Sequence, residues 1–166
     1  MGLAGDKSAM ENLSLPRVTS RSGSVSTLRR TWQLEEFRWA VLSLGVTPPA
    51  PDLPLASFSG GNQQKILLAK WLLHAPSVLV LHEPAQAVDV GARHDILTEI
   101  RRQADTGVAV LVASLETSDL ASLCDRVLVM RDGRVVRELN GDELQSHTIT
   151  DAVYAGVSKE IADVSA

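Results

Sequence analysis

The stretch Ser57-Phe58-Ser59-Gly60-Gly61-Asn62-Gln63-Gln64-Lys65 leads a glycine turn straight into a segment that is predicted to be helical. The first turn of a helix leaves several backbone N–H groups without an intrahelical acceptor, at the positive end of the helix dipole. Such a turn can bind an anion, and phosphate is the usual one. A serine N-cap with a glycine turn is also common at helix starts that bind nothing, so the turn alone leaves both interpretations open.

The composition is that of one ordinary domain with a hydrophobic core, since the chain has 166 residues, of which 45% are hydrophobic. The net charge of −4 does not favour nucleic acid binding. The single cysteine, Cys124, cannot form an intrachain disulfide and is expected to be a small buried residue in a reducing compartment. No apolar run reaches the ~20 residues that span a bilayer, and no signal peptide pattern begins the chain.

The first third of the chain is predicted to be helical. We expect two helices, an intervening loop and an extended proline-rich connector, with Pro16 ending the first helix and Gly45 the second. The two helices are residues 8–13 and 28–44, the loop is residues 18–27 and the connector is residues 48–54.

After Gly61 the pattern changes to alternating helices and strands, which predicts an α/β layer with a mainly parallel sheet. Asp132-Gly133 predicts a tight hairpin turn. The expected helices are residues 62–73, 91–104, 118–123 and 150–155, and the expected strands are 78–81, 108–112, 126–130 and 134–138.

Four segments together resemble one protein family: Ser8–Pro16, Ser59–Lys65, Val88–Ala92 and Cys124–Gly133. Residues from about 3 to 157 are similar to the C-terminal portion of an ATP-binding cassette (ABC) ATPase domain. The specific resemblance is to the second cassette of the tandem ATPases that drive bacterial import of ribose and other simple sugars. Ser59–Lys65 matches the signature motif of that subfamily, and Val88–Ala92 matches its D-loop.

The resemblance implies a partial P-loop NTPase core with a helical subdomain. It divides the chain into a helical subdomain (1–58), the C-terminal part of the core (59–139) and a helical tail (140–166). It implies ATP and Mg²⁺ as ligands, both requiring a complete cassette, and another ABC cassette and the permease subunits of a sugar importer as partners. Nucleic acid binding and direct membrane insertion are not expected. The expected location is cytoplasmic, on the inner face of the plasma membrane when assembled.

The resemblance also assigns roles to residues. Glu83, which follows the strand 78–81, is the expected catalytic base or orienting group for water, the alternative being a surface carboxylate before a proline. Asp89 is expected to join two cassettes, and it can also be an N-cap. The expected nucleotide-binding residues are Ser59, Gly60, Gly61, Asn62, Gln63, Asp89 and Ser114, and no metal-binding residue is predicted.

Three departures from the family pattern weaken the catalytic interpretation. His82 occupies the position of the aspartate that supports Mg²⁺, and an imidazole is a poor partner for that hard ion. Leu115 occupies the position of the usual switch histidine, next to Ser114. No Gly-x-x-x-x-Gly-Lys-[Ser/Thr] phosphate loop occurs in the sequence.

These observations leave three hypotheses. In the first, the chain is part of a sugar-import ATPase whose signature turn, Ser59-Gly60-Gly61, contacts ATP in trans. The isolated chain is then expected to be inactive, and an apolar edge and face of its sheet are expected to be bare. In the second, it is a truncated, non-catalytic cassette that acts as an interaction module. In the third, it is a cassette ATPase of DNA repair or translation, against which the acidic charge balance argues.

Overall fold

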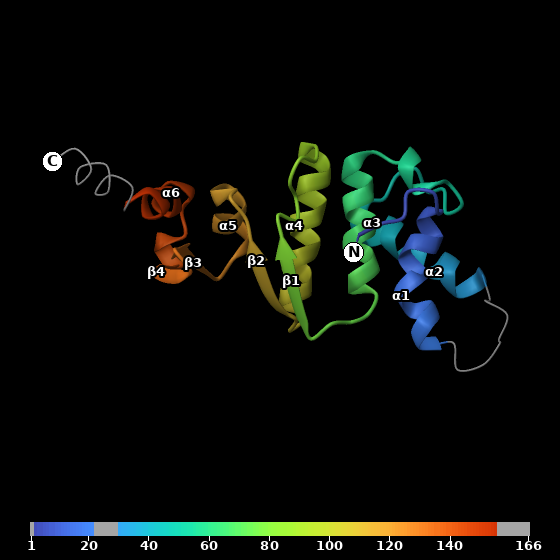
Figure 1. Ribbon diagram of the computed structural model, residues 1–166, viewed down its shortest axis with the longest axis horizontal. Coiled ribbons are helices and arrows are strands. Elements are labelled where there is room, and N and C mark those ends of the chain that lie inside the picture. Colours follow the sequence, from blue (N-terminus) through green and yellow to red (C-terminus); the bar gives the residue numbers. More distant parts are fainter. Residues whose placement is uncertain (1, 22–29, 156–166) are drawn as a thin grey trace. The chain divides into compact units, whose positions relative to one another are not determined.

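The computed structural model of the protein describes residues 2–21 and 30–155. The chain divides into two compact units, residues 1–111 and residues 112–166. The helices and strands of both are labelled in Figure 1. No helix in the described part of the chain combines the length and the hydropathy needed to cross a bilayer.

The first unit begins with three packed helices, α1 (Ala9–Arg21), α2 (Arg30–Leu44) and α3 (Gly60–Leu72), with a short 3₁₀ turn η1 (Leu55–Ser57) before α3. Apolar side chains from all of them are removed from water, and each large one contributes roughly 1.5–3 kcal/mol. These buried residues are Ala9, Met10, Leu13, Phe37, Ala40, Leu44, Leu55, Phe58, Ile66, Ala69 and Leu72.

Helix α1 begins with a reciprocal cap between Ser8 and Glu11. The Ser8 N–H donates to the Glu11 carboxylate at 2.8 Å, and the Glu11 N–H donates to the Ser8 hydroxyl at 3.2 Å. The helix continues through Pro16 to Arg21, so the prediction that Pro16 ends it is wrong, and the predicted loop begins as helix. Packing of α1 against α2 and α3 outweighs the single N–H that proline removes. Residues 22–27 of that loop, and the predicted helix start at residue 28, lie outside the described residues.

The segment after α2 turns back along the start of the chain. Gly45 ends the helix at a φ of +61°, as predicted. The connector 48–54 contains turns, so it is not simply extended. Its carbonyls accept hydrogen bonds from the first helical turn, Ala9 N–H to Leu53 O and Met10 N–H to Pro51 O, both at 3.0 Å. Proline has no N–H to donate, which suits this segment to an accepting role.

A strand–helix–strand unit follows, formed by β1 (Val78–His82), α4 (Val90–Asp105) and β2 (Ala109–Ala113). The two strands form a parallel pair, which confirms the predicted α/β class. Helix α4 buries Ile96 and Ile100, whereas Leu97 between them is only partly buried, and Gly107 follows the end of the helix at a φ of +97°.

One face of this strand pair is exposed although it is apolar. The exposed fractions are 61% for Val78, 69% for Val80 and 60% for Leu111. Parallel strands are normally covered on both faces, so this bare face agrees with the expectation from the sequence.

The second unit contains α5 (Thr117–Leu123), β3 (Arg126–Arg131), β4 (Arg134–Asn140), a 3₁₀ turn η2 (Gly141–Glu143) and α6 (Ser146–Tyr154). Strands β3 and β4 form the predicted hairpin, with both Asp132 and Gly133 at positive φ. Helix α6 begins four residues before the predicted position, because Ile149 in its first turn belongs to the core of this unit. That core consists of Leu120, Val127, Val129, Leu139, Ile149 and Ala152, with Cys124 partly buried against it.

Candidate functional site

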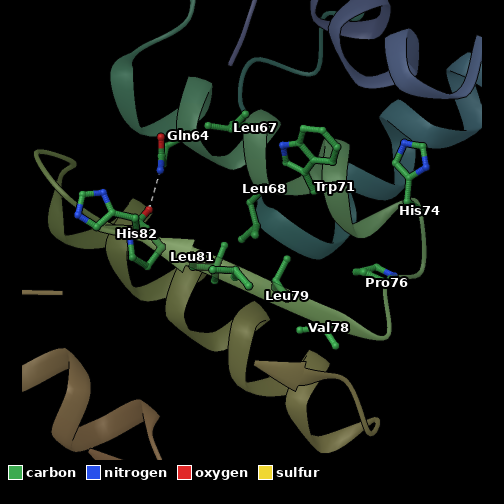
Figure 2. Close-up of a pocket in the computed structure, with 12 residues that line it drawn as sticks. Gln64, Leu67, Leu68, Trp71, His74, Pro76, Val78, Leu79, Leu81 and His82 are labelled. Atoms are coloured by element: carbon green, nitrogen blue, oxygen red, sulfur yellow. Dashed lines mark hydrogen bonds between the residues drawn. The ribbon is translucent and has the colours of Figure 1, made fainter. Parts of the chain in front are cut away.

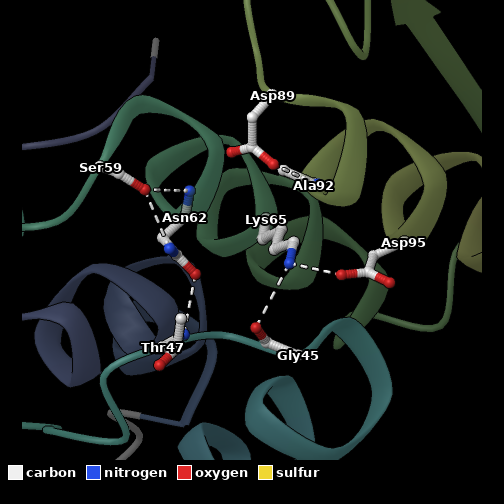
Figure 3. Close-up of polar contacts among 8 residues, drawn as sticks. All are labelled: Gly45, Thr47, Ser59, Asn62, Lys65, Asp89, Ala92 and Asp95. Atoms are coloured by element: carbon white, nitrogen blue, oxygen red, sulfur yellow. Dashed lines mark hydrogen bonds and ion pairs between the residues drawn. The ribbon is translucent and has the colours of Figure 1, made fainter.

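The signature turn forms the start of α3, and Ser59 is its N-cap (Figure 3). The Ser59 hydroxyl accepts hydrogen bonds from the Asn62 side-chain amide at 2.9 Å and from the Asn62 backbone N–H at 3.4 Å. Ser59 and Gly60 are both exposed. The turn therefore offers an accessible hydroxyl beside the first backbone N–H groups of a helix, and these are the donors that bind phosphate oxygens.

The two glycines of the turn have different surroundings. A Cβ added at Gly60 would meet no atom within 4 Å. A Cβ added at Gly61 would lie 2.7 Å from the Ala92 Cβ and 3.1 Å from a carboxylate oxygen of Asp89. Gly60 thus leaves space for a ligand, whereas Gly61 allows α3 to pack closely against the start of α4.

The side chains of Asn62 and Gln63 are both engaged within the chain. Asn62 bonds to Ser59, and its Oδ1 also accepts a hydrogen bond from the Thr47 backbone N–H at 2.8 Å. Gln63 donates to the Phe58 carbonyl at 2.8 Å. Both side chains stabilise the turn through hydrogen bonds within the chain. Their predicted contacts with nucleotide stay predictions.

Asp89 lies beside the signature turn and starts α4. Its Oδ1 accepts a hydrogen bond from the Ala92 N–H at 2.9 Å, so the N-cap role considered from the sequence is confirmed. Its other carboxylate oxygen faces the position where Gly61 lacks a side chain. The close approach of Gly61 to residues 89–92 brings two predicted site segments together.

Glu83 follows the last residue of β1 and is half-buried. Its φ of +48° lies in the left-handed region, which costs a non-glycine residue of order 1 kcal/mol or more. Ala87, at the far end of the same loop, has a φ of +55°. Gln64 of α3 donates to the Pro84 carbonyl at 2.9 Å and so ties the signature helix to this loop. Such backbone strain, held in place by a neighbouring helix, is typical of functional loops.

His82 is exposed at the end of β1, where the family resemblance places a metal-supporting aspartate. Among the described residues, no group of three His, Cys, Asp or Glu side chains is arranged to hold a metal ion. Mg²⁺ prefers carboxylate and other oxygen ligands, so His82 does not fit that ion at this position.

Ser114 belongs to the second unit, whereas the signature turn belongs to the first. Its hydroxyl accepts a hydrogen bond from the Glu116 N–H at 3.1 Å. Leu115 next to it is 88% exposed.

Residues that sequence reasoning missed hold the site together. Lys65 is almost fully buried, and its Nζ donates to Asp95 of α4 at 2.6 Å and to the Gly45 carbonyl at 3.3 Å. Thr47 and Gln64 were also assigned no role. Lys65 and Gln64 belong to the quoted signature stretch, but no local pattern indicates their partners, which lie 20 or more residues away along the chain.

A groove of about 530 Å³ lies between α3 and β1, on the side of the first unit shown in Figure 2. Most of its lining is apolar, and Gln64, His74 and His82 add polar groups. The full lining is Gln64, Leu67, Leu68, Trp71, His74, Pro76, Val78, Leu79, Val80, Leu81, His82 and Pro84. Val78 and Val80 of the exposed apolar face are among these lining residues.

Curated proteins of known role match nearly the whole chain, although no family model matches it. A ribose import ATP-binding protein of Rhizobium johnstonii is 35% identical over 153 residues, which are 91% of this chain and 29% of that protein. A galactofuranose transporter ATP-binding protein of Escherichia coli O157:H7 is 37% identical over 154 residues, 93% of this chain and 31% of that protein. The chain thus spans about three-tenths of the length of these relatives.

Solved structures show the same fold. The ATP-binding cassette MJ0796, solved as a dimer bound to ADP and phosphate, matches 83% of this chain and 58% of its own, with a TM-score of 0.68 and 24% identity. The cassette MJ1267 of an ABC transporter matches 95% of this chain and 63% of its own, with a TM-score of 0.71 and 19% identity.

The fold, the signature turn and these matches define the class: the chain is part of an ATP-binding cassette domain of the ABC transporter family. Within that family its homologues are the ribose and related sugar-import ATP-binding proteins, and it resembles their second cassette.

Proposed function

We propose that the chain supplies the signature side of an ATP site in an ABC ATPase that energises carbohydrate import. The observation that carries this proposal is the start of α3, where the exposed Ser59 hydroxyl and the open backbone at Gly60 form a donor set for phosphate. The homologues support it, because two of them are named for the import of ribose and the transport of galactofuranose.

In this proposal the turn acts in trans. Another cassette holds ATP in its own phosphate loop, and Ser59 and the first N–H groups of α3 close over the γ-phosphate. Asp89 and Glu83 take the roles that the resemblance implies: Asp89 joins the two cassettes, and Glu83 orients or deprotonates the attacking water. For Ser114 we keep the nucleotide contact that the resemblance implies, as a separate part of the proposal. The partners are then a complete cassette and the permease subunits, at the cytoplasmic face of the membrane.

The chain's own contribution is hydrogen-bond donation and rigid positioning. Mg²⁺, when bound in such a site, neutralises charge on the β- and γ-phosphates. Since His82 does not suit that ion, we propose that the partner cassette supplies the ligands of Mg²⁺.

The test is nucleotide binding by the purified chain, alone and mixed with a complete sugar-import cassette whose own signature serine is replaced by alanine. We expect a fluorescent ATP analogue to bind measurably more tightly to the mixture than to either component. Ser59→Ala in this chain should remove most of that gain. Equal affinity with and without this chain would contradict the proposal.

A second candidate function is a non-catalytic interaction module, favoured by the exposed His82 at the metal-supporting position. The two candidates differ in ATP turnover by the mixture. If the chain contributes to hydrolysis, Glu83→Gln should lower the turnover of the mixture, whereas an interaction module predicts unchanged turnover. In both cases we expect no measurable hydrolysis by the isolated chain, and turnover abolished by Glu83→Gln in the purified chain would overturn that expectation.

A further inference from the structure

Asn62 contacts the Ser59 hydroxyl through two groups that can only donate. These are its side-chain amide nitrogen, at 2.9 Å, and its backbone N–H, at the longer distance of 3.4 Å. A serine hydroxyl has two acceptor lone pairs and one donor hydrogen. With Asn62 occupying the lone pairs, the hydrogen of Ser59 stays available, and its partner has to be a hydrogen-bond acceptor.

The orientation of the Asn62 amide is determined by Thr47. The Thr47 backbone N–H donates to Oδ1 at 2.8 Å, and a backbone N–H cannot accept. The amide oxygen must therefore face Thr47, which turns the amide nitrogen toward Ser59, as Figure 3 shows. The three groups form a chain of donors that runs from Thr47 through Asn62 to Ser59.

The position of Thr47 is in turn secured by Lys65. The Lys65 side chain is only 7% exposed, and its Nζ reaches the carbonyl of Gly45 at 3.3 Å, two residues before Thr47. Its ion pair with Asp95 fixes the same ammonium group against α4. The segment after α2 is thus tied to α3 at Asn62 and, one helical turn later, at Lys65.

We propose that Asn62 is a positioning residue that presents the Ser59 hydroxyl as a donor to a phosphate oxygen. It acts through Ser59 and does not itself contact the nucleotide, in contrast to the role that the family resemblance implies for it. This inference rests on the proposed function, because it requires Ser59 to be a phosphate contact.

A double-mutant cycle on Ser59 and Asn62 tests the inference, with the dissociation constant of the ATP analogue measured in the mixture described above. Ser59→Ala should weaken binding about 10- to 100-fold, the usual range for one hydrogen bond to a charged group. Asn62→Ala should weaken it about 3- to 10-fold when Ser59 is present and less than about 2-fold when Ser59 is already alanine, since its effect passes through that hydroxyl.

Gln33→Ala is the matched control. Gln33 of α2 donates its side-chain amide to the Ser14 hydroxyl at 2.8 Å, a contact of the same kind outside the signature turn, so its removal should change affinity less than about 2-fold. The Thr47 amide resonance gives a second readout in the chain alone. It should shift when Asn62 is replaced by alanine and stay nearly unchanged when Ser59 is.

The outcomes distinguish the positioning role of Asn62 from the proposed function of the chain. Equal losses from Asn62→Ala in both backgrounds would overturn the positioning role and leave the proposed function standing. An unshifted Thr47 resonance in Asn62→Ala would also overturn the positioning role. Unchanged affinity on Ser59→Ala would overturn the proposed function, and the positioning role with it.

Discussion

The start of α3 and the loop after β1 were both predicted to serve ATP binding or hydrolysis, yet this chain builds them to different degrees. At the start of α3, the hydroxyl of Ser59, the open backbone at Gly60 and the supporting contacts of Asn62 all come from the chain itself. In the loop after β1, Glu83 is present with a strained backbone, but His82 replaces the metal-supporting carboxylate.

The comparison indicates that donor geometry and hydrolytic chemistry are separable in this fold. Binding a phosphate from one side needs hydroxyl and amide donors held rigidly, which one helix start and its neighbours provide. Hydrolysis further needs a metal ion and a positioned water, and the loop after β1 provides only part of that requirement. The predictions below test how rigid the first region is and how the second depends on it.

Gly61→Ala should have the largest effect on stability. The added methyl group would lie 2.7 Å from the Ala92 Cβ, inside the contact between α3 and α4, and we expect a loss of about 1–3 kcal/mol in the free energy of unfolding. Gly60→Ala is the matched control, because its methyl group meets no atom within 4 Å, and it should stay within about 0.5 kcal/mol of the wild type. Urea denaturation measures both. Equal effects of the two changes would mean that the close approach at Gly61 is not what holds the turn against α4.

Lys65→Met should have the next largest effect on stability, a loss of about 1–2 kcal/mol in the free energy of unfolding. The change keeps the length of the side chain but removes its bonds to Asp95 and to the Gly45 carbonyl. Because Asp95 is 43% exposed, water can take over its charge, so the loss is smaller than for a fully buried pair.

Asp95→Asn is the corresponding control for Lys65→Met. It retains an acceptor for Lys65, so by the same reasoning it should lower the free energy of unfolding by less than about 1 kcal/mol. A larger loss in Asp95→Asn than in Lys65→Met, again by urea denaturation, would contradict the assignment of Lys65 as the central group.

Local patterns predicted most of the architecture but not these supports. The strand–helix–strand alternation, the stop at Gly45 and the hairpin at Asp132-Gly133 are properties of short segments, so periodicity and glycine positions indicate them. The Ser59 cap is equally local. The bond from Thr47 to Asn62 joins residues 15 apart, and the pair of Lys65 with Asp95 joins residues 30 apart. Such contacts appear only when the helices pack.

The same reasoning explains why the predicted bounds of the first and last helices were wrong. Pro16 is a strong local signal for a helix end, but the packing of α1 against α2 and α3 outweighs it. The tail helix has weak local signals, and its true start depends on Ile149 reaching a core made by distant residues. The roles of Asp89 and Ser114 toward nucleotide remain predictions.

Gln64→Ala tests whether α3 supports the loop that carries Glu83. Loss of the bond to the Pro84 carbonyl should cost about 0.5–1.5 kcal/mol and loosen residues 83–89. We expect faster amide hydrogen exchange at Gln86, whose N–H donates to the Glu83 carbonyl at 3.3 Å. Gln63→Ala should leave the exchange of Gln86 unchanged. Unchanged exchange in both variants would show that the loop keeps its conformation without α3.

The smallest expected effect is a difference in acid sensitivity between the caps of α1 and α3. The hydrogen bond from the Ser8 backbone N–H, followed by the bond with the Ser8 hydroxyl, holds the pKa of Glu11 below its ordinary value of 4.5. A carboxyl with a lowered pKa in the folded state stabilises the fold above its ordinary value, and this contribution is lost as the pH falls through the lowered value. Ser59 carries no ionisable group, so the cap of α3 should not respond to the same titration.

The measurement is amide exchange at Glu11 and Asn62, the two N–H groups that donate to the cap hydroxyls, between pH 6 and pH 3 after correction for the intrinsic rate. Protection at Glu11 should fall with acid in the wild type and vary less in Glu11→Gln, while protection at Asn62 stays constant relative to its neighbours. Since Glu11 is exposed, solvent screening limits the effect to below about 0.5 kcal/mol. A parallel loss at Asn62 would mean that the start of α3 depends on the charged cap of α1, and the signature turn would then not be held by its own contacts.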